Sequence, residues 1–123
     1  NHESPKINGD GSYSRDFTYI DNVIRMNVLC MTTKNKNALN QIYNTACGEQ
    51  TTLLGLVSIL KKYMSNYDPK IASIKLKFGP IRSGDVPHSL ASIEKAALNL
   101  KYTCDYSFEK GISDAIHWYW NNL

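Results

Sequence analysis

The chain has 123 residues, 42% of them hydrophobic and 20% charged, and its formal net charge is +3. This length and apolar content predict one domain with a real core. The net charge is too small by itself to indicate binding to nucleic acid or to an anionic membrane surface. No apolar run approaches the roughly 20 residues that a transmembrane helix requires, so an integral membrane protein is not expected.

The cysteines and histidines show no spacing that is typical of a disulfide framework or of a zinc site. They are Cys30, Cys47, Cys104, His2, His88 and His117. Because the number of cysteines is odd and no CxxC pair occurs, we expect unpaired thiols in a reducing cytoplasm. Cys104 is accordingly expected to be an inert thiol rather than a nucleophile, and no metal site is expected.

The first third of the chain predicts a strand, a helix and a second strand. Arg15–Ile20 has the aromatic and β-branched content of a short strand. Asp21 or Asn22 then caps a helix that runs to about Thr33. This helix is apolar nearly all round, which predicts burial on more than one side. Gln41–Cys47 has the character of the second strand.

The middle of the chain predicts the clearest helix and a third strand. Thr51 or Thr52 caps the helix, whose apolar residues recur at helical spacing over residues 53–64. Ser73–Phe78 then alternates between apolar residues and lysines, which predicts a half-buried strand.

Two further helices are predicted before the end of the sequence. Ser92 caps a short helix that runs through Leu100, and Ser107 caps the last one. Strands and helices are mixed without strict alternation. The predicted class is therefore α/β, or α+β for the chain taken alone, with short strands and about four helices.

A loop from Gly79 to Ser89, here called the arginine loop, holds Arg82 and Asp85 three positions apart. Its glycines and prolines exclude a regular helix or a central strand. An isolated arginine is by default a solvated surface residue, but a tight turn holds its side chain with little freedom. Arg15 has a similar place beside the first strand, with an aspartate next to it. Guanidinium groups bind phosphate with two parallel hydrogen bonds and carboxylates accept from ribose hydroxyls, so both pairs fit a sugar diphosphate.

Three stretches together resemble a known protein family: NGDGSYSRDFTYIDNV, GPIRSGDVPHSLASIEKA and YSFEKGISDAIHWYW. The chain resembles the C-terminal region of extended short-chain dehydrogenase/reductase enzymes that act on nucleotide sugars, and among them the bacterial UDP-N-acetylglucosamine 4-epimerases. The resemblance implies a UDP-sugar-binding domain over residues 1–123. The family's N-terminal Rossmann domain, which binds NAD, has no counterpart here, because the sequence contains no glycine fingerprint. We therefore expect this chain to be part of a longer protein.

The resemblance implies substrate-binding roles for five residues. Arg15 would reach the UDP phosphates, and Arg82 and Asp85 would bind the diphosphate and the uridine ribose. Ser89 stands where relatives strict for UDP-galactose and UDP-glucose carry a bulky tyrosine, so it would leave room for a 2-acetamido group. His88 lies next to it and would either reach the ligand or lie free on the surface.

The activity implied for the longer protein is the interconversion of UDP-N-acetylglucosamine and UDP-N-acetylgalactosamine through an NAD-bound 4-keto intermediate, with UDP-glucose and UDP-galactose as a wider range. The chain itself would supply no catalytic residue, bind no NAD and be inactive alone. Its expected partners are the UDP-sugar and its own Rossmann domain, with no nucleic acid and no membrane. With its apolar helix uncovered, the chain is also expected to self-associate.

Two alternatives remain open. Another enzyme of the extended family, a nucleotide-sugar dehydratase or decarboxylase, would share the arginine motifs and differ around its catalytic tyrosine. A non-enzymatic, mildly basic binding module would bind polyanions with a steep salt dependence. The module gives no reason for the two arginine motifs to occur together.

Overall fold

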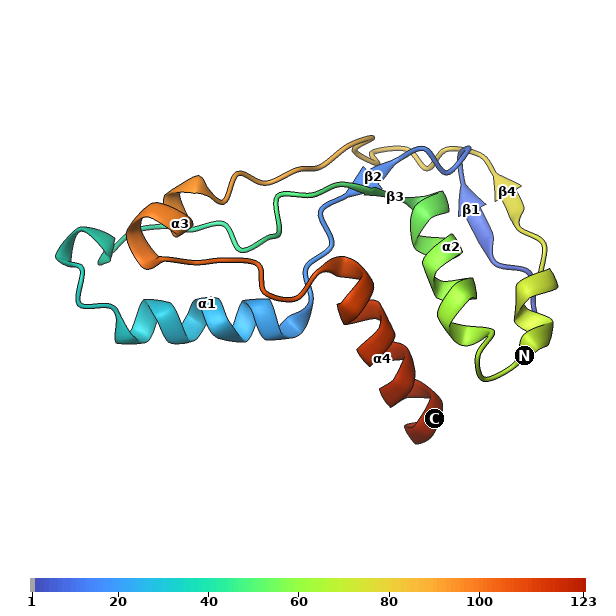
Figure 1. Ribbon diagram of the computed structural model, residues 1–123. Helices are drawn as coiled ribbons and strands as arrows, with labels where there is room; N and C mark the ends of the chain where they lie inside the picture. The colour runs from blue at the N-terminus through green and yellow to red at the C-terminus, as the bar shows by residue number, and fades with distance from the viewer. Residues whose placement is uncertain (1) are drawn as a thin grey trace.

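The computed structural model describes residues 2–123 and contains four α-helices, four short strands and two 3-10 helices (Figure 1). In chain order they are β1 Lys6–Asn8, β2 Ser14–Arg15, α1 Ile20–Thr32, η1 Lys36–Ala38, β3 Thr51–Thr52, α2 Leu53–Met64, η2 Pro69–Ser73, β4 Lys77–Gly79, α3 Glu94–Leu100 and α4 Phe108–Asn122. The predicted class, a small mixed domain of short strands and four helices, is confirmed.

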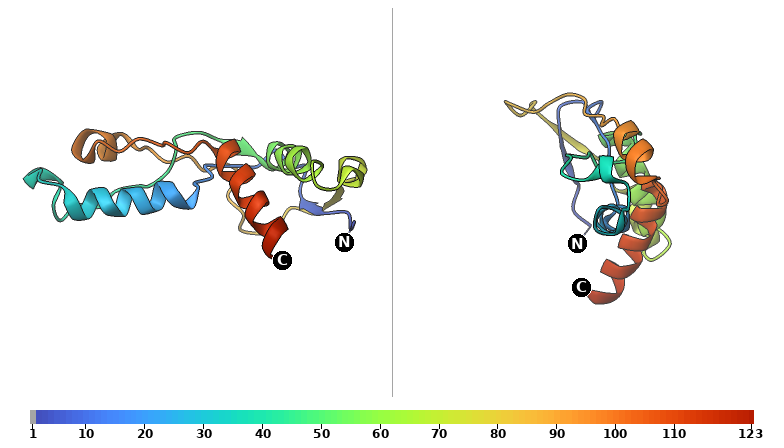
Figure 2. Two further views of the ribbon diagram at one scale, coloured as in Figure 1. Left: turned by 60° about the horizontal axis from the view of Figure 1, so that its bottom comes forward. Right: turned by 90° about the vertical axis from the view of Figure 1, so that its left-hand side faces the viewer.

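The molecule is elongated, and helices occupy both of its ends (Figures 1 and 2). One end holds α1, α3 and η1, and the other holds α2, η2 and the β1–β4 pair. Long extended segments and the β2–β3 pair run between the ends, and α4 begins at the centre. The strands form two separate pairs: β1 with β4 in parallel, and β2 with β3 antiparallel.

Local capping explains where two of the helices begin. The Thr52 hydroxyl accepts a hydrogen bond from the Gly55 N–H at 3.0 Å and starts α2, and the Ser107 hydroxyl accepts from the Lys110 N–H at 3.3 Å and starts α4. Both caps were predicted from the sequence. The other two helices lack a side-chain cap: α1 begins at Ile20, after Tyr19.

The third cap prediction, Ser92, is wrong, because α3 has no side-chain cap. α3 begins at Glu94, with Ile93 at the cap position, while the Ser92 hydroxyl lies 3.5 Å from the Glu94 N–H. The helix ends at Leu100, and the cap residue after it, Lys101, has a left-handed backbone with φ 58°. Glycine is the residue that adopts this conformation without a steric cost, so a lysine here is under strain.

The three predicted strands are shorter than expected or absent. In the stretch Arg15–Ile20 only Arg15 is in a strand, and Ile20 already belongs to α1. Within Ser73–Phe78 only Lys77 and Phe78 are in β4, where Phe78 is exposed rather than half-buried. Gln41–Cys47 forms no strand, because no strand of the described chain runs beside it.

Side chains make hydrogen bonds to the backbone of residues 46–48, at the end of the segment that forms no strand. The Asp16 carboxylate accepts from the Cys47 N–H at 3.1 Å and from the Gly48 N–H at 2.9 Å. The Tyr102 hydroxyl donates to the Ala46 carbonyl at 2.9 Å, and burial raises the pKa of this tyrosine, which keeps it protonated as a donor. The segment is thereby fixed in an irregular conformation.

Asn22 joins α1 to the turn before α4. Its side chain is completely buried. The amide oxygen accepts from the N–H groups of Asp105 and Tyr106, both at 3.1 Å, and the amide nitrogen donates to the Tyr106 carbonyl at 2.8 Å. Asn22 was predicted as a possible helix cap. It lies inside the helix instead, and its side chain serves a distant segment.

The expectation that the cysteines are all unpaired thiols is wrong for two of them. Cys47 and Cys104 form a disulfide, while Cys30 is free and exposed. The two residues are 57 positions apart, so their proximity depends on the folded chain and not on a sequence pattern. The bond lies beside Asn22, whose amide nitrogen is 3.3 Å from the Cys104 sulfur.

The chain exposes more surface than a self-contained domain of its size. Its accessible surface is 8480 Å², about 1,800 Å² above the roughly 6,700 Å² typical of a folded monomer of this mass. The prediction that α1 is buried on several sides fails within this chain, because Met26 is its only buried hydrophobic residue. A stripe on α1 faces outward instead, formed by Ile20, Ile24, Val28 and Met31.

We predict that the disulfide stabilises the fold. Closing a loop of this length removes enough chain entropy from the unfolded state to contribute about 4 kcal/mol. Reduction with dithiothreitol, or the Cys47→Ser and Cys104→Ser changes, should lower the midpoint of thermal unfolding followed by circular dichroism. Cys30→Ser is the control and should leave it in place. Equal midpoints for the oxidised and reduced chain would contradict the prediction.

We also predict that the chain self-associates through the outward stripe of α1. A strand edge at residues 41–47 is not available for this contact, because that segment forms no strand. Exposed apolar patches of several hundred Å² tend to bind another protein surface. Sedimentation velocity at micromolar concentration should show a dimer or larger species, and Ile24→Glu should shift it toward monomer. Leu98→Glu on α3, also exposed, serves as the control. A clean monomer with a cooperative melt would show that the chain covers its own apolar surface.

Candidate functional site

The candidate site is built where the end of the arginine loop lies against β2. The Ser14 N–H donates to the Pro87 carbonyl at 2.9 Å, and the Ser89 N–H donates to the Ser14 carbonyl at 3.1 Å. Ser14 and His88 form a parallel bridge between these segments. Two regions that are 74 positions apart in the sequence therefore lie side by side.

Arg15 extends from β2 toward the arginine loop. It is half-buried, and its Nη1 donates to the Ser14 carbonyl at 2.8 Å and to the Pro87 carbonyl at 3.3 Å. These contacts use one nitrogen of the guanidinium, so the others remain available for a ligand. β3 supports this position from the other side, because Arg15 pairs with Thr51 across the antiparallel strands.

Arg82 and Asp85 form an ion pair on the outer part of the arginine loop. Arg82 Nε and Nη2 both donate to Asp85 Oδ1, at 3.0 and 2.8 Å. The Arg82 side chain is 71% exposed, and the adjacent carboxylate raises the pKa of its guanidinium above the ordinary value. Gly84 makes the turn between them with φ 86°, a conformation that glycine adopts without steric cost.

Ser89 and His88 complete the set of predicted residues, and both are exposed. His88 Nδ1 lies 2.9 Å from the Ser14 hydroxyl, so one of its two ring nitrogens is already engaged. The structure thus brings Arg15, His88 and Ser89 together around Ser14. It holds Arg82 and Asp85 against each other further out on the same loop.

Sequence reasoning missed Ser14, the residue that connects these parts. Ser14 is only 4% exposed and contacts three successive residues of the arginine loop. A serine beside an arginine carries no signal of such a role in the sequence. Its importance appears only when the loop is placed against β2.

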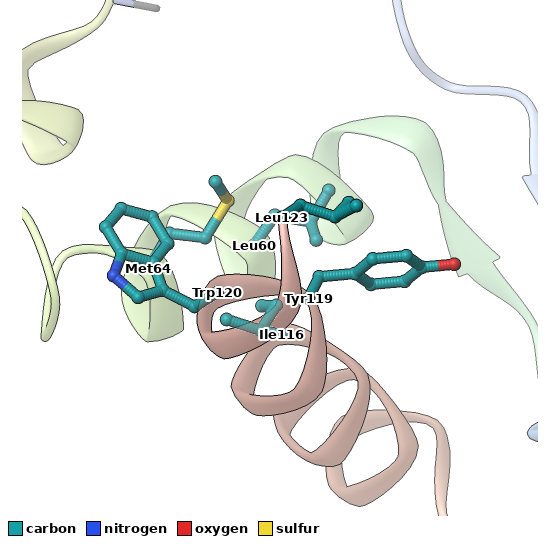
Figure 3. A pocket seen from close by; sticks show the side chains of 6 residues that line it. All are labelled: Leu60, Met64, Ile116, Tyr119, Trp120 and Leu123. Atoms are coloured by element: carbon teal, nitrogen blue, oxygen red, sulfur yellow. The ribbon is translucent and has the colours of Figure 1, made fainter.

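A separate apolar groove lies between α2 and α4 and has a volume of about 430 Å³. Its lining is Leu60, Met64, Ile116, Tyr119, Trp120 and Leu123 (Figure 3). In Figure 3, Trp120 lies beside Met64 while the Tyr119 ring extends in the opposite direction. The lining contains no charged side chain and none of the predicted site residues, so this groove does not fit a nucleotide phosphate.

Residues 2–123 contain neither a metal site nor a membrane-spanning helix. In that part of the chain no three side chains with metal-binding groups cluster closely enough to hold an ion. No helix there combines the length and the apolar character that are needed to span a bilayer.

Several sequence relatives of the chain are nucleotide-sugar epimerases, and no protein-family model matches it. A putative UDP-glucose 4-epimerase of Methanocaldococcus jannaschii is 28% identical over 98% of this chain and 35% of its own length. UDP-glucuronate 4-epimerase 5 of Arabidopsis thaliana is 30% identical over 89% of this chain and 26% of its own length. The chain therefore spans about a third of the length of the curated relatives it matches.

Solved structures give the same result. A UDP-glucose 4-epimerase of Thermotoga maritima with UDP-glucose superposes on 99% of this chain and 36% of its own, with a TM-score of 0.85 and 31% identity. A UDP-N-acetylglucosamine 4-epimerase of Methanobrevibacter ruminantium, in complex with UDP-N-acetylmuramic acid, superposes on 98% of this chain and 36% of its own, with a TM-score of 0.84 and 29% identity. The homologues and structural neighbours of the chain are thus UDP-sugar 4-epimerases, and its fold matches the C-terminal part of the epimerase structures.

Proposed function

We propose that this chain is the substrate-binding C-terminal domain of an NAD-dependent UDP-sugar 4-epimerase. The observation that carries the proposal is the contact between β2 and the arginine loop. It places Arg15 beside the segment that bears His88 and Ser89, within a fold that matches the C-terminal part of epimerase structures. The motifs that resemble the family therefore lie together in space as well as occurring together in the sequence.

The geometry supports a division of roles between the charged residues. Arg15 has guanidinium N–H groups left over after its carbonyl contacts, and these would bind one phosphate of the UDP moiety. Arg82 keeps N–H groups that Asp85 does not use, so it can bind a second phosphate while Asp85 holds its orientation. The free oxygen of Asp85 would then accept from a ribose hydroxyl.

NAD does not fit the residues of this chain. The sequence has no glycine-rich phosphate loop. Its one Tyr-x-x-x-Lys spacing, Tyr106 to Lys110, falls at the start of α4, where Lys110 Nζ lies over the Tyr106 ring. We therefore assign NAD, the catalytic tyrosine and the proton and hydride transfers to a separate N-terminal Rossmann domain. The contribution of this chain is to bind and orient the UDP-sugar, and by itself it should show no epimerase activity.

The exposed surface supports a large partner domain. The excess of roughly 1,800 Å² over a self-contained monomer exceeds the area that one partner buries in a standard interface, about 800 Å². The α1 stripe of Ile20, Ile24, Val28 and Met31 is apolar, as the contacts between permanently associated domains are. We propose that the Rossmann domain covers this stripe and extends a strand beside the irregular segment 41–48.

The preferred sugar is proposed from Ser89. This residue is small and exposed at the end of the arginine loop, and its backbone is fixed by the bond to Ser14. A small side chain at a fixed backbone position leaves room for a bulky substituent on the sugar. We propose that the 2-acetamido sugars, UDP-N-acetylglucosamine and UDP-N-acetylgalactosamine, are accepted.

The phosphate roles predict the effect of removing either arginine. In the intact protein with its Rossmann domain, Arg82→Ala and Arg15→Ala should each weaken UDP binding roughly 10- to 100-fold, the loss of one or two charge-assisted hydrogen bonds. Isothermal titration with UDP measures this directly. Lys75→Ala removes the same charge from an exposed position outside the loop and should have little effect. Unchanged UDP affinity in both folded arginine variants would show that the two arginines are solvated surface residues and do not bind the phosphates.

The sugar preference predicts a selective effect at Ser89. Ser89→Tyr should fill the space for the acetamide and reduce turnover of UDP-N-acetylglucosamine far more than turnover of UDP-galactose. Ser89→Ala keeps the space open and should leave the ratio of the two rates as it is. The measurement is kcat/KM for each sugar in the intact protein. An equal loss of kcat/KM for both sugars in Ser89→Tyr would show that Ser89 does not select for the acetamido group.

A further inference from the structure

We propose that His88 is a positioning residue, which fixes the end of the arginine loop to β2 through its hydrogen bond to Ser14, and does not itself bind the ligand. The Ser14–His88 latch is this bond, 2.9 Å between His88 Nδ1 and Ser14 Oγ. The inference rests on the proposed function for its consequence in ligand binding. Its structural part can be tested without any ligand.

The first argument is the burial of Ser14. Its side chain is almost fully buried, and within residues 2–123 the hydroxyl contacts no other polar group than His88 Nδ1. A buried hydroxyl without a partner is costly, so the fold favours the His88 rotamer that supplies one. The bond forms with either tautomer, because the hydroxyl can donate to a bare Nδ1 or accept from a protonated one.

The second argument is how little else holds the arginine loop. At its start, Gly79 is held by β4 and by the Gly9 N–H, which donates to the Gly79 carbonyl at 2.9 Å. In the described part of the chain, residues 80–86 make no hydrogen bond to any other segment, and the Arg82–Asp85 contacts are internal to the loop. The other fixed point is the contact of residues 87–89 with Ser14.

The third argument is that the contact at Ser14 is a single bridge and not a continued ladder. Two backbone hydrogen bonds at one residue make a short attachment that opens readily. The latch adds a side-chain bond at the same residue. It therefore restrains Pro87, whose carbonyl also accepts from Arg15, and Ser89, which is proposed to face the sugar. A loop restrained at both ends loses less conformational entropy when it binds a ligand.

The test compares Ser14→Ala, His88→Ala and the double variant with His88→Asn. Asparagine places an amide oxygen or nitrogen near the position of Nδ1 and can restore the bond to Ser14. His117→Ala is the matched control, because this histidine lies on α4 and bonds to Tyr67. Folding of every variant is checked by circular dichroism and its thermal midpoint.

The first readout is amide hydrogen exchange of the Ser89 N–H, followed by NMR in the unliganded chain. Ser14→Ala and His88→Ala should each speed this exchange roughly two- to tenfold, the value of one neutral hydrogen bond, and the double variant should add little to either. His88→Asn should restore protection, and His117→Ala should not change it. Unchanged exchange in both single variants would overturn the latch.

The second readout is UDP affinity, titrated by NMR into the same variants. The latch requires that Ser14→Ala and His88→Ala weaken binding by a similar factor, roughly two- to tenfold. If His88→Ala weakens binding while Ser14→Ala does not, His88 contacts the ligand and the proposal is wrong. If the unaltered chain binds no UDP, the proposed binding role fails for the isolated chain, and hydrogen exchange alone decides the latch.

Discussion

The buried amide of Asn22 is the interaction on which the rest of the molecule depends. A single side chain holds the start of α1 against the turn from which α4 departs, because it satisfies two N–H groups and one carbonyl of that turn. The disulfide lies against the same amide and adds the segment that contains Cys47. Asp16, one residue from Arg15, binds the backbone of that same segment. The backbone next to Arg15 is therefore connected through polar contacts to the segment that the disulfide joins.

The sequence predicted contacts between residues a few positions apart, but it did not predict contacts between distant segments. Thr52 and Ser107 cap helices through residues three positions away, so their hydroxyls were informative in the sequence. The segment Gln41–Cys47 has strand composition, but strand formation also needs a neighbouring strand, and none lies beside it in the described chain. The bond between Cys47 and Cys104 likewise joins distant segments, and an odd number of cysteines argued against it.

The same distinction applies to the candidate site. Arg82 and Asp85 are three positions apart on one loop, so their pairing could be anticipated from the sequence alone. The nearness of Arg15 to Pro87 and Ser89 could be inferred only through a family resemblance, and it is explained by Ser14, which no local pattern marks. What the sequence could not provide is the mutual arrangement of segments more than 70 positions apart.

The left-handed backbone at Lys101 has a consequence for how such a domain can change over time. A non-glycine residue in this conformation costs roughly 1 kcal/mol or more, which the packing around the end of α3 must offset. This cost is carried at one end of the molecule, in a different part of the chain from β2 and the arginine loop. A Lys101→Gly change would recover the cost without altering any group that is proposed to contact the nucleotide. That gain would allow the fold to tolerate a destabilising substitution in the arginine loop of similar size.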